Sequence, residues 1–174
     1  MRLRAVLLVA LLGAFGAWGV LHAQKPFKEY PGFEYTNFEV PPDANVPHEW
    51  TRARLKYTQY GGGGFGRRGF GGGNRWTMDY PRSDRHLLPG IARLTRIDAR
   101  SVEQVVALDD DDDAFNFPWI YAVQVGEWAL TEKEGAKMRE YIQRGGFFMA
   151  DDVHGDAEWA EFAKRIRFAF SYPR

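Results

Sequence analysis

The feature that most constrains the fold is a strand, a helix and a second strand in close succession between residues 119 and 150. Residues 119–125 form a nearly continuous apolar run rich in β-forming side chains, which is typical of a strand covered on both faces. Thr131 and Glu134 have the spacing of a capping box, and the glycine pair at 145–146 predicts the end of that helix. Residues 147–150 predict a buried, central strand. This βαβ unit predicts an α/β fold with a mostly parallel sheet.

Further elements are expected before and after this unit. Ala53, Leu55 and Tyr57 alternate with charged or polar residues, which predicts a half-buried strand. Residues 102–108 predict another short strand, and residues 156–168 predict a last helix.

A helix is also expected between residues 83 and 94, although one residue conflicts with it. Leu87, Ile91 and Leu94 recur at helical spacing, and Ser83 is the expected N-cap. Pro89 lies inside this run and lacks the N–H of an internal hydrogen bond. We therefore expect either a kink or a helix that begins near Pro89.

The N-terminus has the pattern of a secretory signal peptide. Arg2 and Arg4 precede an apolar run at residues 5–21, and Ala23 is a suitable cleavage residue. An uncleaved membrane anchor is the alternative, but the run is shorter than the roughly 20 residues of a spanning helix. We predict a signal peptide at 1–23, a Pro- and aromatic-rich tether at 24–51, and an α/β domain at 52–174 in the periplasm or outside the cell. Contact with a membrane is then expected only if the signal stays uncleaved.

Composition excludes several functions. The chain has no cysteine, so disulfides, zinc–thiolate sites and thiol nucleophiles are excluded. A nucleic-acid partner is not expected, because without residues 1–23 the chain carries 21 basic and 23 acidic side chains. A Gly-x-Ser-x-Gly nucleophile elbow is also absent from the sequence.

Residues 61–73 contain nine glycines and predict a mobile loop. Such a segment loses much backbone entropy on ordering, which favours a flexible lid or linker. Phosphate binding is the alternative, but no Gly-Lys-Ser/Thr element follows.

Two short signatures resemble the domain of unknown function 4159 family. The first is Trp-x-x-Asp-Tyr-Pro from Trp76 to Pro81, and the second is Gly-Gly-Phe-x-x-x-Asp-Asp from Gly145 to Asp152. The resemblance covers roughly residues 52–162 and implies a flavodoxin-like, class I glutamine amidotransferase-like three-layer sandwich. Members of this family continue with further strands, so the resemblance implies a chain truncated at its C-terminus. Amidotransferase chemistry is not expected, because the chain lacks the nucleophile.

Two clusters are candidate sites. Asp151, Asp152 and His154 follow a predicted strand, where α/β sheets bind ligands, and could hold a divalent metal or do acid–base chemistry. One aspartate is expected to face the crevice and the other the neighbouring helix, and capping of the next helix is the structural alternative.

The second cluster is Trp76, Asp79 and Tyr80, whose rings could stack on a sugar or an aromatic ligand. Its alternative is a loop anchor in which Asp79 bonds to the backbone. The acidic run at residues 109–113 predicts a solvated loop rather than a calcium site.

Two functions follow from these residues. The first is a non-catalytic module that binds an envelope protein or a glycan and needs no cofactor. The second is a metal-dependent hydrolase of envelope glycans or peptides that uses Asp151, Asp152 and His154.

Export can be tested by N-terminal sequencing of the protein recovered from outside the cytoplasm. Cleavage after Ala23 predicts a mature chain that begins at Gln24. Recovery of the chain from the membrane fraction with Met1 intact would show an anchor instead.

Overall fold

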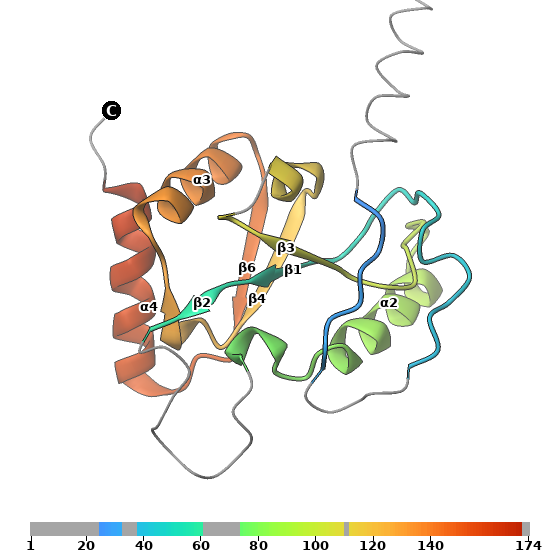
Figure 1. Cartoon of the computed structure of the whole chain (residues 1–174), viewed down its shortest axis with the longest axis horizontal. Helices are drawn as coiled ribbons and strands as arrows, with labels where there is room; N and C mark the ends of the chain where they lie inside the picture. Colours follow the sequence, from blue (N-terminus) through green and yellow to red (C-terminus); the bar gives the residue numbers. More distant parts are fainter. Residues whose placement is uncertain (1–24, 33–37, 61–73, 110–111, 172–174) are drawn as a thin grey trace, which may run out of the picture.

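A parallel four-stranded sheet lies between helices on its two faces (Figure 1). The computed structural model describes residues 25–32, 38–60, 74–109 and 112–171, so the predicted signal peptide and the predicted Gly-rich loop lie outside the described residues. Within these ranges the strands have the order β3-β1-β4-β6, and every neighbouring pair is parallel. Their bounds are β1 (Ala53–Lys56), β3 (Gln104–Ala107), β4 (Trp119–Val123) and β6 (Phe147–Asp151).

The helices form the outer layers of the fold. Helix α2 (Arg82–Leu94) lies on one side of the sheet, and α3 (Glu132–Gln143) and α4 (Gly155–Phe170) lie on the other (Figure 1). A second, two-stranded sheet pairs β2 (Thr58–Gln59) antiparallel with β5 (Trp128–Ala129). The short 3₁₀ helices are η1 (Arg75–Thr77), η2 (Asp112–Asn116) and η3 (Val125–Glu127). No helix in the described ranges has the length and apolar character needed to cross a membrane.

The predicted βαβ unit is confirmed as β4, α3 and β6. Thr131 Oγ accepts a hydrogen bond from the Glu134 N–H at 3.2 Å, and the Glu134 carboxylate accepts one from the Thr131 N–H at 2.8 Å. This capping box fixes the start of α3. The helix ends before Gly145, whose φ of 93° is in the left-handed region that glycine tolerates.

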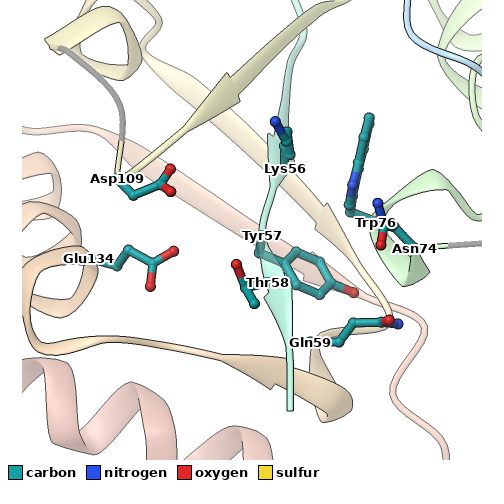
Figure 2. Close-up of a pocket in the computed structure, with 8 residues that line it drawn as sticks. All are labelled: Lys56, Tyr57, Thr58, Gln59, Asn74, Trp76, Asp109 and Glu134. Carbon is teal, nitrogen blue, oxygen red and sulfur yellow. The ribbon is translucent and has the colours of Figure 1, made fainter. Parts of the chain in front are cut away.

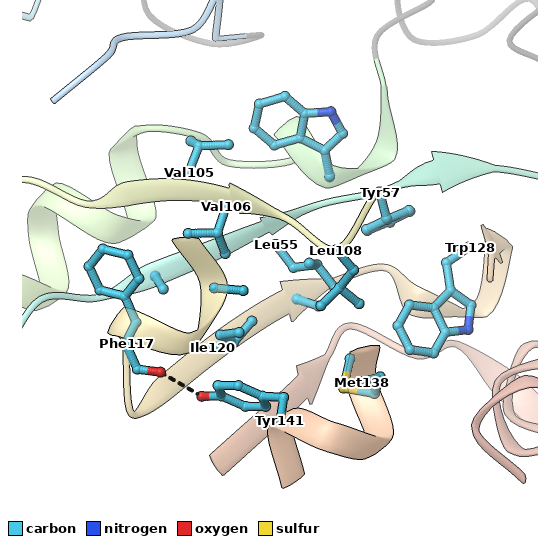
Figure 3. Close-up of a cluster of buried hydrophobic side chains, with 14 of the residues drawn as sticks. Leu55, Tyr57, Val105, Val106, Leu108, Phe117, Ile120, Trp128, Met138 and Tyr141 are labelled. Atoms are coloured by element: carbon cyan, nitrogen blue, oxygen red, sulfur yellow. Dashed lines mark hydrogen bonds between the residues drawn. The ribbon is translucent and has the colours of Figure 1, made fainter. Parts of the chain in front are cut away.

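The apolar core lies between the sheet and α3 (Figure 3). Leu55 and Ile120 come from β1 and β4, and Met138 and Tyr141 come from α3. The Tyr141 hydroxyl donates a hydrogen bond to the Phe117 carbonyl at 2.9 Å, so its polar end is satisfied inside the core.

Strand β1 corrects the prediction of a half-buried strand. Its apolar residues are buried as predicted and pack in the core that includes α3, but Arg54 on the other face is also completely buried. The reason is that β1 lies between β3 and β4 and that Asp84 on α2 covers Arg54 with an opposite charge.

Strand β6 is not the buried, central strand that the sequence predicted. It lies at the end of the strand order among the described residues, and its side chains alternate between exposed and half-buried. The apolar run therefore reflects an edge strand with an exposed face.

Helix α2 corrects two further predictions. Of the two alternatives for this segment, a helix that begins near Pro89 is wrong, because α2 begins at Arg82 and Pro89 lies inside it. A kink at Pro89 stays a prediction. Ser83 lies within the first turn and is not the N-cap, because Pro81 has that position. The Ser83 hydroxyl instead accepts a hydrogen bond from Arg54 at 3.3 Å.

Two other segments, one around Asp113 and one around Tyr30, pack against the rest of the domain. Asp113, in the run expected to be solvated, is buried, and Asn116 donates a hydrogen bond to it at 3.3 Å. Near the N-terminus, Tyr30 packs edge-on against Trp76 with ring centroids 5.7 Å apart, and Glu29 pairs with Arg85 at 2.9 Å.

Two glycine-to-alanine substitutions test the packing around α3 and β6. A Cβ at Gly146 would overlap the Tyr141 ring, whereas a Cβ at Gly90 in α2 meets nothing within 4 Å. Gly146→Ala should destabilise the fold by about 1–3 kcal/mol, and Gly90→Ala should stabilise it by about 0.5–1 kcal/mol. Urea unfolding of both variants measures the difference, and equal effects would contradict this packing.

Candidate functional site

A pocket of about 190 Å³ lies beyond the carboxyl ends of β1 and β3 (Figure 2). In Figure 2, Asp109 and Glu134 reach toward it from one side, Asn74 and Trp76 lie on the other, and Thr58 lies between them. The lining residues come from four segments of the chain: Lys56, Tyr57, Thr58, Gln59, Asn74, Trp76, Asp109 and Glu134. Ligands of open parallel sheets bind at this edge, which makes the pocket the candidate site.

Arg54 positions the segment that carries Trp76. Its Nε donates to the Trp76 carbonyl at 2.9 Å, and another guanidinium nitrogen donates to the Met78 carbonyl. Its third nitrogen pairs with the Asp84 carboxylate at 2.6 Å. One buried cation therefore connects β1, the η1 turn and the first turn of α2.

Asp84 also forms an ion pair with a second arginine, Arg52. The Arg52 Nε lies 2.7 Å from the other Asp84 oxygen, and the Arg52 guanidinium stacks 4.0 Å from the centre of the Tyr121 ring. Burial raises the pKa of Tyr121 to about 12, so its phenol stays neutral beside this cluster at physiological pH. The carboxylate of Asp84 thus balances two cations on the α2 face of the sheet.

Tyr57 forms one wall of the pocket. Its hydroxyl donates to the Val123 carbonyl at 2.7 Å, which fixes the ring at the end of β4. Burial raises the pKa of this phenol, which keeps it protonated and therefore a hydrogen-bond donor. Tyr57 is accordingly a rigid wall rather than an acid or base.

Glu127 connects β2 and η1, the two segments that border the pocket. Its carboxylate pairs with both sides of the Arg75 guanidinium at 3.0 and 3.1 Å. Its carbonyl accepts a hydrogen bond from the Tyr60 N–H at 2.9 Å. These bonds hold β2 and η1 against η3 beside the pocket.

The pocket combines both signs of charge with one unpartnered donor. Asp109 and Glu134 contribute carboxylates, while the Lys56 ammonium lies 5.6 Å from the centre of the Tyr30 ring. The buried indole N–H of Trp76 has no hydrogen-bond partner among the described residues. Such a lining can bind a small ligand that carries a cation and several hydrogen-bonding groups.

A comparison with protein families identifies the domain. The model named "Domain of unknown function (DUF4159)" matches residues 53–171. The chain belongs to the DUF4159 family. A search of curated proteins returns no match to it.

The first DUF4159 signature surrounds the Arg54 anchor. Tyr80 is completely buried and accepts a hydrogen bond from the Tyr30 N–H at 3.3 Å, while Asp79 is exposed and has a φ of 54°. Of the three residues predicted to bind a ligand, only Trp76 lines the pocket. Ligand binding by this cluster stays a prediction.

The second DUF4159 signature ends in the predicted metal cluster. The Tyr121 hydroxyl donates to Asp151 at 3.3 Å, and the His154 Nε2 lies 3.2 Å from an Asp152 oxygen. The N-cap of α4 is His154, without a side-chain cap, so neither aspartate caps this helix. No group of three or more His, Cys, Asp or Glu side chains suited to a metal occurs in the described part of the chain.

Sequence reasoning missed most of the site. Arg54 and Asp84 were not singled out, although an arginine inside an apolar strand pattern is the signal that could have found the buried pair. The pocket residues Lys56, Asn74 and Glu134 carry no local motif for ligand binding, because separate segments bring them together.

The Asp84 carboxylate should be the most sensitive acidic group of this DUF4159 domain. Asp84→Asn leaves two guanidinium groups without their counter-charge, so we expect a loss of about 3–5 kcal/mol of unfolding free energy. Exposed Asp156 in α4 is the matched control, and Asp156→Asn should change stability by no more than about 0.5 kcal/mol. Equal urea midpoints for the two variants would show that the buried pair contributes little.

Proposed function

We propose that this protein is an exported, non-catalytic binding module that holds a small amino-bearing ligand in the pocket beyond β1 and β3. The observation that carries the proposal is the pocket itself, where two carboxylates face hydrogen-bonding side chains and the buried Trp76. The signal-peptide pattern supports a location outside the cytoplasm.

The strand order supports a flavodoxin-like, glutamine amidotransferase-like sheet. Counted along the chain, β3-β1-β4-β6 has the order 2-1-3-4, which is the start of the flavodoxin-like order 2-1-3-4-5. In such sheets the ligand lies outside the carboxyl ends of the strands. The pocket occupies this edge, which supports its assignment as the binding site.

The lining favours an amino sugar. The Asp109 and Glu134 carboxylates suit an ammonium group, and Thr58, Gln59 and Asn74 offer donors and acceptors to hydroxyls. Glu134 is held in place by the capping box, so its charge is fixed before a ligand arrives. Envelope glycans supply amino sugars outside the cytoplasm, in agreement with the partner class expected from the sequence.

Among the described residues, the pocket offers neither a Ser–His nor a Cys–His nucleophile pair. The sequence has no cysteine, and the pocket lining among the described residues contains no serine or histidine. The hydrolase alternative would need Asp151, Asp152 and His154 to act together. Asp151 instead bonds to Tyr121 while Asp152 pairs with His154, so no observation favours this alternative.

Titration with glucosamine tests the proposal, with glucose as the matched ligand that lacks the amino group. We expect calorimetric binding of glucosamine and at least about tenfold weaker binding of glucose, because glucose cannot pair with the carboxylates. Asp109→Asn should weaken glucosamine binding by about tenfold without changing the glucose signal.

Asp156→Asn serves as the matched control protein, because it removes an exposed carboxylate from α4 outside the pocket lining. It should bind glucosamine like the unmodified protein. Equal binding of glucose and glucosamine, or no binding of either, would overturn the proposed ligand class.

A further inference from the structure

Lys56 places a positive charge at a pocket whose proposed ligand is also positively charged. In Figure 2 it lies between Asp109 on one side and Trp76 on the other, and all three line the pocket. Register pairs Lys56 of β1 with Ala107 of β3, and Asp109 follows Ala107 by two residues. Because neighbouring strands are only about 4.8 Å apart, the long Lys56 side chain can reach the Asp109 carboxylate. An ion pair between the two residues would occupy the acidic side of the pocket.

The ammonium of Lys56 instead lies against an aromatic ring. It is 5.6 Å from the centre of the Tyr30 ring, which is the geometry of a cation–π contact. Among the residues that the structure describes, no carboxylate pairs with this ammonium. The carboxylates of Asp109 and Glu134 therefore keep their charges available for a ligand.

Three contacts hold the Tyr30 ring in this place. The Tyr30 backbone N–H donates to the Tyr80 hydroxyl at 3.3 Å, and the ring packs edge-on against Trp76 with centroids 5.7 Å apart. The neighbouring Glu29 pairs with Arg85 at 2.9 Å. The half-buried ring is thus fixed beside the pocket before any ligand arrives.

We propose that Tyr30 is a positioning residue, whose ring holds the Lys56 ammonium away from Asp109 and Glu134 and so keeps both carboxylates free for the amino group of a ligand. Tyr30 does not line the pocket and acts through Lys56. The effect on binding rests on the proposed function, whereas the placement of Lys56 can be measured without a ligand. A cation–π contact at an exposed site changes an equilibrium by about two- to fivefold, which sets the size of the effect.

Nuclear magnetic resonance of the ligand-free protein tests where Lys56 lies. The ring current of Tyr30 should move the Lys56 ε-methylene protons upfield, and Tyr30→Leu should remove this shift while it keeps an apolar side chain against Trp76. The Asp109 carboxyl carbon should also change its chemical shift in Tyr30→Leu, because Lys56 then reaches it, but not when Lys56→Met is present as well. Lys56 protons without an upfield shift in the unmodified protein would overturn the proposal.

Glucosamine titration measures the consequence for binding. Tyr30→Leu should weaken binding by about two- to fivefold, because Lys56 then competes for the carboxylates. In the Lys56→Met background the same substitution should weaken binding by less than about 1.5-fold, since no competing ammonium remains. Tyr30→Phe keeps the ring and should restore the affinity that Tyr30→Leu loses.

Lys28 provides the matched control for this cycle. Its ammonium lies 5.1 Å from the centre of the same Tyr30 ring, but Lys28 does not line the pocket. Lys28→Met should therefore leave the loss caused by Tyr30→Leu at its full size. Thermal melts of all variants show whether each one is folded.

The outcomes separate this inference from the proposed function. Equal losses from Tyr30→Leu with and without Lys56→Met would overturn the positioning role, because Tyr30 would then support the pocket only as part of the fold. Equal relief by Lys28→Met and Lys56→Met would overturn it too. Absence of glucosamine binding to the unmodified protein would instead overturn the proposed function, and the resonances of Lys56 and Asp109 would still decide whether Tyr30 holds this lysine away.

Discussion

The buried guanidinium of Arg54 is the group on which the rest of this structure depends. Its side chain has no exposed surface, and removing a charge from water costs several kcal/mol unless it is paired and hydrogen-bonded. Asp84 supplies the opposite charge, and the carbonyls of Trp76 and Met78 accept further hydrogen bonds. Arg54 can therefore be buried at a tolerable cost only if β1, η1 and the first turn of α2 keep their positions around its guanidinium.

The two faces of the sheet consequently have different roles. The face toward α3 packs Leu55 and Ile120 against Met138 and Tyr141, which provides ordinary hydrophobic stabilisation. The face toward α2 carries the arginines and Asp84 and fixes where η1 lies. Because Trp76 is part of η1, the polar face also sets one wall of the pocket.

Local sequence patterns were sufficient for the βαβ unit. The capping box, the glycine end signal and the apolar runs act within a few residues, so α3 and its flanking strands could be predicted. Arg54 could not be placed in the same way, because alternation predicts a solvent-facing side chain and the partner Asp84 lies 30 residues away. The edge position of β6 depends on strand order, which an apolar run does not specify.

The pocket could not be predicted from local sequence patterns for a related reason. Asp109 and Glu134 belong to segments with structural explanations of their own, an acidic loop and a capping box. Only the meeting of β1, β3 and α3 makes them neighbours. Trp76 was identified because it lies in a recognisable signature, and its contact with the pocket follows from the Arg54 anchor.

Hydrogen exchange in Arg54→Lys tests this anchoring role most directly. Lysine keeps the charge but lacks the guanidinium fork that reaches Asp84 and two carbonyls together. If Arg54 anchors η1, the amides of Thr77, Met78 and Tyr80 should exchange faster in the variant while those of Ile120 and Ala122 in β4 keep their protection. Unchanged exchange at Thr77, Met78 and Tyr80 would contradict the account, because the turn would then hold its place without Arg54.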